Sequence, residues 1–167
     1  KLRKRRKKEG AFFFSHSQYT NQLSENLEKA LISKKESLES EQLIEEFMLL
    51  NNFVLAEIAE EDGLPILYRG HIPPRKDDIK YLKQLKKELG PKEIKLRVNT
   101  MGEWADWLDQ QGLAQPFHLM VLKTLNTAKY YPEPCFHFGL NEPVYSHFTS
   151  PIRRFPDLWN HIVFKNY

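Results

Sequence analysis

Two adjacent arginines follow a hydroxyl-bearing turn near the end of this 167-residue chain. Thr149 and Ser150 precede Pro151, and this pattern is typical of a helix that begins at the proline or, after a turn, at the next one. Arg153 and Arg154 would then lie at a helix N-terminus, where the helix dipole disfavours a cation. Backbone N–H groups, hydroxyls and guanidinium groups in one place can bind a phosphate.

An ordinary ion pair is the alternative interpretation of this run. Asp157 is close enough in sequence for one arginine to pair with it while the other lies on the surface. Both interpretations stay open on these residues alone.

A second candidate lies on a long helix expected over residues 40–62, with Ser40 as its N-cap and Gly63 just beyond its end. Apolar residues occur all around it, which predicts a central, buried helix. Glu45 and Asn52 are seven residues apart and therefore share one face. A buried carboxylate needs a partner or a ligand. Alternatively, Glu45 reaches solvent near the helix start and interacts with the dipole.

Aromatic and histidine side chains are weaker candidates. Phe12, Phe13 and Phe14 follow a basic tract and could stack on bases, although strand alternation lets only one or two face a site. His137 and His147 have no neighbouring cysteine or recognisable ligand spacing, so we expect structural histidines and not metal ligands.

The elements that must position these residues alternate between strand and helix patterns, which predicts an α/β or α+β fold. The pattern of residues 15–40 leaves a weak helix and a hairpin both open. We expect strands at 10–14, 64–71 and 94–98, helices at 77–89, 101–111, 117–130 and from 150 onward, and extended chain at 131–148.

Charge and composition exclude several classes of protein. The net charge is +3, but the first eight residues carry seven positive charges, so the rest of the chain has 3 − 7 = −4. Polyanion binding must therefore be local, and the basic tract itself is either a solvated tail or an RNA contact. The single cysteine, Cys135, excludes an internal disulfide and favours a cytoplasmic location. No apolar run is long enough to span a membrane.

Blocks of residues along most of the chain resemble one enzyme family in family order. Residues 145–158 with His161 resemble the signature near the end of the RNB catalytic domain of ribonuclease R and ribonuclease II, which are 3′→5′ exoribonucleases. The other matching blocks are residues 43–52, 67–74, 137–140 and 2–11. We therefore expect residues 1–167 to be the C-terminal part of such a domain, with further parts outside it.

The resemblance implies processive hydrolysis of single-stranded RNA to nucleoside 5′-monophosphates with Mg²⁺, by an enzyme that is monomeric at full length. Arg153 resembles the arginine that grips the scissile phosphate, and Arg154 would support it or hold a neighbouring phosphate, beside Thr149 and Ser150. Glu45, with Asn52 on the same face, resembles the glutamate that positions the 3′-terminal nucleotide. Phe14 would clamp the terminal base.

The family holds its metal with a short aspartate-rich cluster that precedes the part of the domain seen here, and no window of this chain contains one. We therefore expect the Mg²⁺ ligands to lie outside it. Phe13, Asn51, Phe136 and Ile162 depart from the family's usual residues, and Phe155 is a milder change. These departures leave a non-catalytic RNA-binding relative as the alternative. A helical adaptor with a basic tail is a third possibility.

Overall fold

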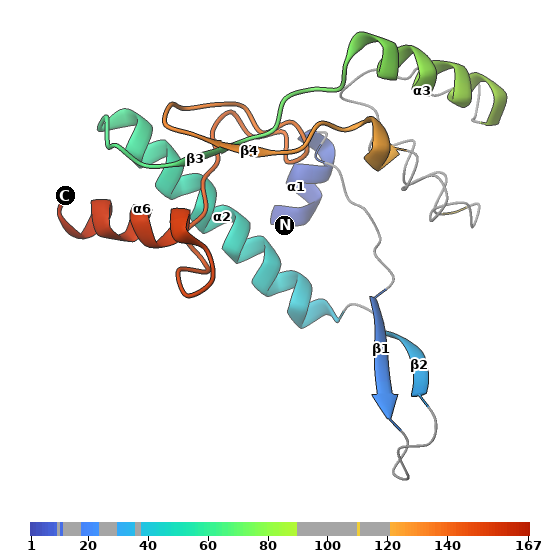
Figure 1. Cartoon of the computed structure of the whole chain (residues 1–167), viewed down its shortest axis with the longest axis horizontal. Coiled ribbons are helices and arrows are strands. Elements are labelled where there is room, and N and C mark those ends of the chain that lie inside the picture. The colour runs from blue at the N-terminus through green and yellow to red at the C-terminus, as the bar shows by residue number, and fades with distance from the viewer. Residues whose placement is uncertain (10, 12–17, 24–29, 36–37, 90–109, 111–120) are drawn as a thin grey trace.

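The computed structural model describes residues 1–9, 11, 18–23, 30–35, 38–89, 110 and 121–167. Helices and strands are mixed, as expected (Figure 1). The strands form two separate antiparallel pairs, β1 with β2 and β3 with β4. In chain order the elements are α1 (Leu2–Glu9), β1 (Gln18–Leu23), β2 (Ala30–Lys35), α2 (Glu39–Glu61), β3 (Tyr68–Gly70), α3 (Lys76–Leu89), β4 (Lys129–Tyr131) and α6 (Phe155–Lys165).

Helix α2 begins and ends close to the predicted residues. Its N-cap is Leu38 and not Ser40, and the Glu41 carboxylate accepts a hydrogen bond from the Leu38 N–H at 3.2 Å. Glu39 and Glu41 in the first turn complement the helix dipole. Gly63 follows the helix with φ of 63°, the left-handed conformation that a glycine adopts without strain.

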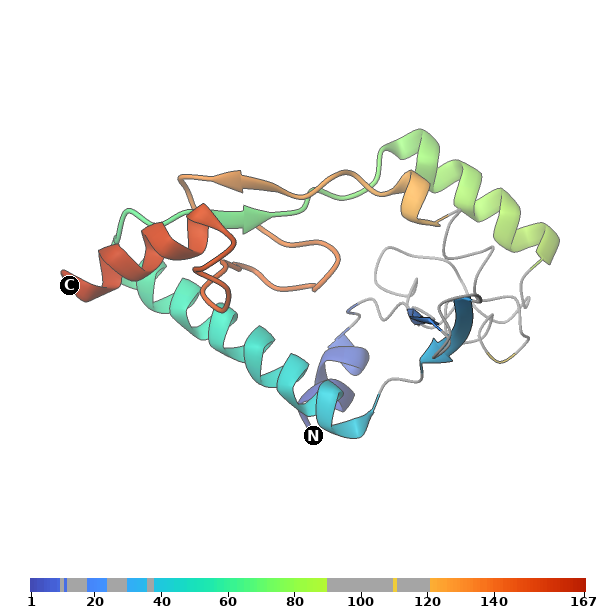
Figure 2. The same cartoon turned by 60° about the horizontal axis from the view of Figure 1, so that its bottom comes forward.

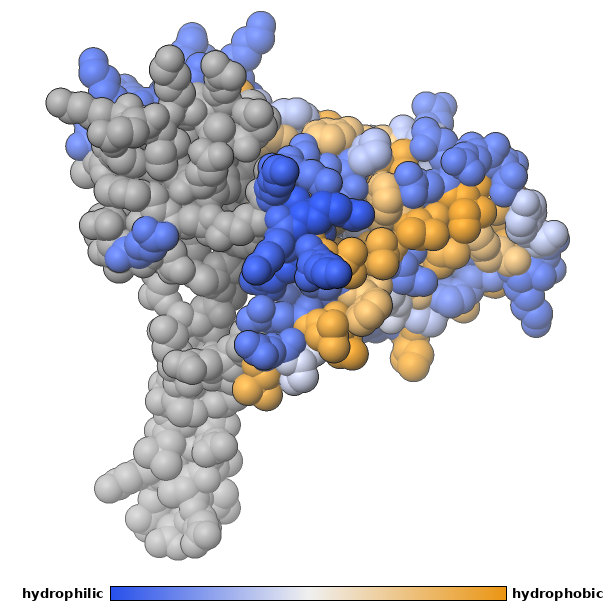
Figure 3. Space-filling model, turned by 180° about the vertical axis from the view of Figure 1, so that it is seen from behind, coloured by the Kyte–Doolittle hydropathy of each residue, from blue (hydrophilic) through white to orange (hydrophobic). Residues whose placement is uncertain are grey.

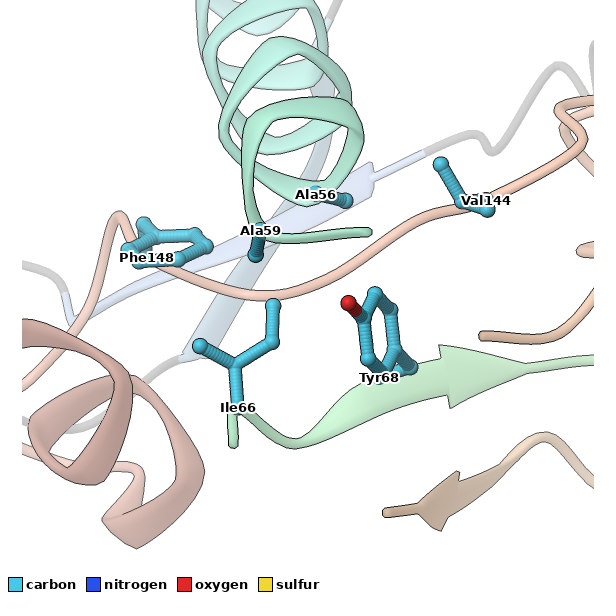
Figure 4. Packing of buried hydrophobic residues seen from close by; sticks show 6 residues of the cluster. All are labelled: Ala56, Ala59, Ile66, Tyr68, Val144 and Phe148. Atoms are coloured by element: carbon cyan, nitrogen blue, oxygen red, sulfur yellow. The ribbon is translucent and has the colours of Figure 1, made fainter. Parts of the chain in front are cut away.

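The core lies where the C-terminal half of α2 packs on the chain that follows it. Ala56 and Ala59 are fully buried, so the helix approaches β3 and the 144–148 segment closely (Figure 4). The four other members of this cluster are Ile66, Tyr68, Val144 and Phe148. Figure 2 shows α6 beside this end of α2, and Val163 and Phe164 of α6 pack on the same cluster. Helix α6 and the core are therefore one packing unit.

The 144–148 segment lies beside β3 and is joined to it by an isolated bridge. The Arg69 N–H donates to the Tyr145 carbonyl at 2.7 Å, and Tyr68 and Ser146 form an antiparallel bridge. Extended chain was expected over 131–148, and the structure confirms it apart from a turn near Asn141, whose φ is 55°. Strand β3 is therefore paired along both of its edges.

Several expected elements differ from the structure. Residues 18–35, left open between helix and hairpin, contain the β1–β2 hairpin. The helix expected over 117–130 is wrong at its end, because the described helical residues stop at Thr124 and β4 begins at Lys129 to pair with β3. The strand expected over 64–71 is limited to β3, and the final helix begins at Phe155. The predicted 77–89 helix is confirmed as α3.

Three predicted elements lie almost wholly outside the described residues. These are the 94–98 strand, the 101–111 helix, of which residue 110 is described, and the 10–14 strand, of which Ala11 is described.

The basic tract at the start of the chain is a helix docked on α2, which corrects its interpretation as a solvated tail. Arg6 and Glu46 form a buried ion pair with a distance of 2.8 Å between Nη1 and Oε1. A more exposed pair joins Arg3 to Glu45 at 3.6 Å. The tract therefore contributes charges to the packing of α1 on α2 as well as to the surface.

Helix α2 is buried on one side only, so the prediction of an all-round buried helix is wrong for its first half. Leu43, Ile44 and Phe47 are each more than half exposed. Figure 3 shows an apolar band on this surface beside a hydrophilic patch. A helix that is apolar all round is usually covered on all sides, so a second layer would fit this face. No helix in the described part of the chain is long and apolar enough to cross a membrane.

We predict that Arg6→Met lowers the free energy of unfolding by about 3 kcal/mol, because it leaves the buried Glu46 carboxylate without its cation. Arg5→Met is the matched control on the same helix, since the ion pair that Arg5 forms within the described part of the chain, with Glu9 at 3.7 Å, is exposed. The control should change stability by less than about 0.5 kcal/mol. Urea denaturation of both variants measures the difference, and equal losses would contradict a special role for the buried pair.

Candidate functional site

The turn that precedes α6 presents the hydroxyl and arginine side chains singled out in the sequence. The N–H groups of Arg153 and Arg154 donate to the Ser150 carbonyl at 3.3 and 3.1 Å, which closes the turn. Arg154 is the N-cap of α6, and Pro156 lies in the first helical turn, where its missing N–H costs nothing. Of the two predicted helix starts, the later one is therefore confirmed, and both arginines lie at the N-terminus of α6 as expected.

Asp157 stabilises this turn through hydrogen bonds on its buried side. Its side chain is completely buried, and one carboxylate oxygen, Oδ1, accepts from the Ser150 N–H at 2.8 Å and from Arg154 Nη2 at 2.6 Å. Arg154 also approaches the Thr149 hydroxyl at 3.3 Å. The ion-pair interpretation is therefore correct for Arg154, whose guanidinium supports the turn. Its predicted contact with a phosphate stays a prediction.

Arg153 differs from its neighbour in being exposed. Its Nη2 lies 3.5 Å from the Ser150 hydroxyl, at the limit of a hydrogen bond. The structure thus leaves most of the Arg153 guanidinium open to a ligand from solvent. The Thr149 and Ser150 side chains, both partly exposed, lie beside the two arginines. Together with the N-terminus of α6, these groups can bind an anion.

The chain just before the turn is fixed to both α2 and α6. The Phe148 N–H donates to Asn52 Oδ1 of α2 at 2.9 Å, and His161 Nε2 of α6 donates to the Phe148 carbonyl at 2.7 Å. Asn52 also donates to the Tyr145 hydroxyl at 2.9 Å. Both ends of the buried Asn52 amide therefore position the 145–148 segment, and its predicted contact with RNA stays a prediction.

Asn160 makes a second connection between α6 and the core. Its side chain is completely buried and accepts from the Leu67 N–H at 2.8 Å. Its Nδ2 group donates to the Ser146 hydroxyl at 2.8 Å and lies 3.2 Å from the His147 carbonyl. This single side-chain amide forms hydrogen bonds with backbone groups of both extended segments, as a neighbouring strand would do. It therefore fixes the position of α6 relative to these two segments.

Glu45 and Asn52, which share a face of α2 by spacing, have different surroundings. The Glu45 side chain is 59% exposed and pairs with Arg3, whereas Asn52 is buried. Among the described contacts, none joins Glu45 to the turn at 149–154. Phe14 lies outside the described residues. The predicted roles of Glu45 and Phe14 toward an RNA 3′ end therefore stay predictions.

The histidines near the site are part of the packing, as expected. His137 Nδ1 accepts from the Leu140 N–H at 3.2 Å, and His147 Nδ1 is hydrogen bonded to the Tyr130 hydroxyl at 2.8 Å. Burial, with His71 as the next cause, lowers the pKa of His137 to about 3. Burial and the nearby Arg154 lower the pKa of His147 to about 4. Both rings are therefore neutral near pH 7.

Acidic and metal-binding side chains do not gather at this site. In the part of the chain that the structure describes, no three His, Cys, Asp or Glu side chains lie close enough together to hold a metal ion. The described residues therefore do not fit the magnesium that the sequence resemblance implies. They fit an anionic ligand instead.

Sequence patterns singled out Asn52 only as a possible RNA contact and gave no sign of the backbone contacts that Asn52 and Asn160 make. Asn52 and Asn160 act on backbone groups more than ninety positions away along the chain, and no local spacing reveals such contacts. Their presence inside helices, where asparagine is unfavourable, is the only available hint. The i, i+3 spacing of Arg154 and Asp157 did indicate their ion pair, but not the bond from Asp157 to Ser150.

Comparison with known proteins gives matches over the whole chain. Residues 1–167 match the RNB domain. The chain is 33% identical to Ribonuclease R of Thermotoga maritima over 170 residues, which covers 99% of this chain and 24% of that protein. It is 34% identical to Ribonuclease R of Escherichia coli over 137 residues, which covers 80% and 17%. The chain thus spans about a quarter of these relatives or less.

Solved structures show the same arrangement. The chain is similar to Mycoplasma genitalium RNase R in complex with ribose-methylated single-stranded RNA, with a TM-score of 0.83 and 26% identity over 98% of this chain and 26% of that one. It also shares its fold with yeast Ssd1, a pseudonuclease, with a TM-score of 0.66 and 21% identity over 83% and 17%. The mixed fold expected from the sequence is therefore confirmed.

We predict that the free energy of unfolding falls as pH is lowered from about 6.5 toward 4. In this window the unfolded chain binds protons at His137 and His147 that the folded chain excludes, because both folded pKa values are lowered. Each histidine contributes up to about 1.4 kcal/mol per pH unit. His137→Asn should make the pH dependence shallower, as urea denaturation at several pH values would measure. An unchanged slope would contradict this.

Proposed function

Because the chain belongs to the RNB domain family, we propose that it forms part of a 3′→5′ exoribonuclease and supplies contacts to the RNA backbone. The proposed substrate is single-stranded RNA, degraded processively to nucleoside 5′-monophosphates. Support comes from the ribonuclease R relatives and from an RNase R structure solved with single-stranded RNA. The whole enzyme is proposed to be monomeric and cytoplasmic.

The exposed Arg153 carries this proposal. Asp157 already neutralises Arg154, so Arg153 contributes the turn's uncompensated positive charge among the described residues. A guanidinium can bind a phosphate through two parallel hydrogen bonds. Placed at the scissile phosphate, it would stabilise negative charge that increases in the transition state. Thr149 and Ser150 would donate to the same phosphate or the next one.

Other contacts are proposed at the 3′ end of the RNA. Glu45 would position the terminal nucleotide once its exposed pair with Arg3 is exchanged for a ribose hydroxyl, and Phe14 would stack on the terminal base. Asn52 would act through the 145–148 segment that it holds, besides any direct contact.

Bound magnesium would supply an activated water and stabilise the leaving oxygen in such a reaction, and we propose that the whole enzyme requires it. Since the described residues offer no metal-binding group, its ligands are proposed to lie outside this chain. The residues described here would then act on the RNA and leave metal binding to the remainder of the enzyme.

We predict that Arg153→Ala, in a full-length RNB enzyme that contains this chain, lowers turnover by roughly 100-fold or more, because charge on the transition state loses a donor. RNA affinity should fall far less, by no more than about tenfold. Arg75→Ala is the matched control, since Arg75 is an exposed arginine just before α3. Single-turnover release of nucleotides and equilibrium binding would be measured on the same RNA. Equal losses in turnover and affinity would contradict a transition-state role.

We also predict that the 167-residue chain alone releases no nucleoside monophosphates from RNA in the presence of Mg²⁺. The physical reason is that no window of its sequence contains the aspartate-rich cluster that the resemblance implies for the metal. Incubation with end-labelled single-stranded RNA, with and without EDTA, would test this. Metal-dependent release above the EDTA control would refute it.

A non-catalytic RNA-binding relative remains the second candidate, because the fold also occurs in yeast Ssd1, a pseudonuclease. The two candidates differ in the full-length protein. An enzyme binds and degrades the RNA, whereas the alternative binds it, with a strong dependence on salt, and leaves it intact. If RNA does not bind at all, the chain is an adaptor and both proposals fail.

A further inference from the structure

Asp157 is the most completely buried acidic side chain beside the proposed phosphate site. Its exposed fraction is 0%, whereas the side chain of its partner Arg154 is 23% exposed. A buried carboxylate is costly to desolvate, and it persists only where hydrogen bonds and a cation compensate it. Among the described residues, those groups come from the turn at 149–154, namely the Ser150 N–H and the Arg154 guanidinium.

We propose that Asp157 is a positioning residue, which fixes the Ser150 backbone and the Arg154 side chain so that Arg153 and the turn hydroxyls face the RNA phosphate. The proposal rests on the proposed function, since it takes Arg153 to be the phosphate contact. Asp157 itself does not touch the substrate, because its carboxylate is enclosed.

The first argument is geometric. Asp157 lies in the first turn of α6, and its Oδ1 reaches back to the N–H of Ser150, before the helix begins. The Ser150 carbonyl accepts in turn from the N–H groups of Arg153 and Arg154. One carboxylate therefore holds Ser150 through its N–H, and the carbonyl of the same residue accepts from the Arg153 N–H. A reacting group displaced by about 1 Å can cost about 100-fold in rate.

The second argument concerns charge. Two adjacent arginines at a helix N-terminus repel each other and the positive end of the dipole. Asp157 neutralises Arg154, so the three side chains together carry one net positive charge. That charge lies on Arg153, at the surface. Without Arg154, the buried carboxylate would oppose binding of a phosphate. The three charges therefore act together.

The third argument separates positioning from general stability. The segment before the turn is held independently, by Asn52 and His161 at Phe148 and by Asn160 farther back. Among the described residues, Asp157 bonds to the turn and not to the core, and its Oδ2 has no partner. Loss of its charge should therefore disturb the turn while the fold is retained.

A double-mutant cycle in the full-length enzyme tests the proposal, with Asp157→Asn and Arg153→Ala made singly and together. Asparagine keeps an oxygen for the Ser150 N–H and removes the charge that holds Arg154. If Asp157 acts through Arg153, the single Asp157→Asn change should lower turnover by about tenfold or more and alter RNA affinity by less than about threefold. In the Arg153→Ala background the same change should lower turnover by less than about twofold.

The outcomes are distinguishable. The same fold reduction of turnover in both backgrounds overturns the positioning role, because a structural defect does not depend on Arg153. If Arg153→Ala lowers turnover but Asp157→Asn does not, only the role of Asp157 is overturned. If Arg153→Ala has no effect, the proposed function fails, and the proposal for Asp157 fails with it.

A second variant protects the test against misfolding. Asp157→Glu keeps the charge that pairs with Arg154 but moves the carboxylate one methylene away from the Ser150 N–H. Circular dichroism and thermal melting would show which variants fold. If Asp157→Asn does not fold, the cycle is run with Asp157→Glu. We then expect a smaller loss of turnover, and we expect this loss to disappear again in the Arg153→Ala background. A loss that persists there overturns the proposal.

Discussion

The structure depends on one constraint, which is that backbone polar groups buried in the 144–148 segment must be hydrogen bonded. This segment has β3 on one side, through Tyr145 and Ser146, and no further strand on the other among the described residues. Side chains of α2 and α6 supply the missing partners. Asn52 of α2 accepts a hydrogen bond from the Phe148 N–H, and His161 of α6 donates one to the Phe148 carbonyl. The position of α6, and of the turn before it, follows from these bonds.

The same constraint explains why polar residues occupy buried positions in helices that otherwise pack with small or apolar ones. Ala56 and Ala59 let α2 approach β3, and Asn52 lies on the same helix closer to its N-terminus, where hydrogen bonding and not close packing is needed. On α6, Asp157 and Asn160 are buried beside Val163 and Phe164 of the core. Apolar replacements at the polar positions would leave buried donors and acceptors unpaired, which costs about 1–3 kcal/mol for each group.

Local patterns predicted what local forces determine. Helices α2 and α3 were predictable from their periodicity and from Gly63, and the start of α6 after a turn was one of two options. The end of the 117–130 helix was not, because pairing of β4 with β3 over a long sequence separation overrides helix propensity. The docking of α1 was also missed, since the partner of Arg6 is forty residues away. For the site, the arginines were found from their types, whereas the asparagines that hold them in place act through distant contacts.

Two adjacent arginines look equivalent in the sequence, and helix geometry makes them different. Residue 157 lies one turn beyond residue 154, so the Asp157 carboxylate faces Arg154 and reaches its Nη2 at 2.6 Å. Arg153 precedes the helix, in the turn before the extended N-cap Arg154, and lies at the surface. An exchange of the two roles would require the turn to unwind and Ser150 to lose its bond to Asp157. The residue at which α6 begins therefore determines that Arg154 supports the turn and that Arg153 is exposed. The capacity of the turn to bind an anion follows from this arrangement.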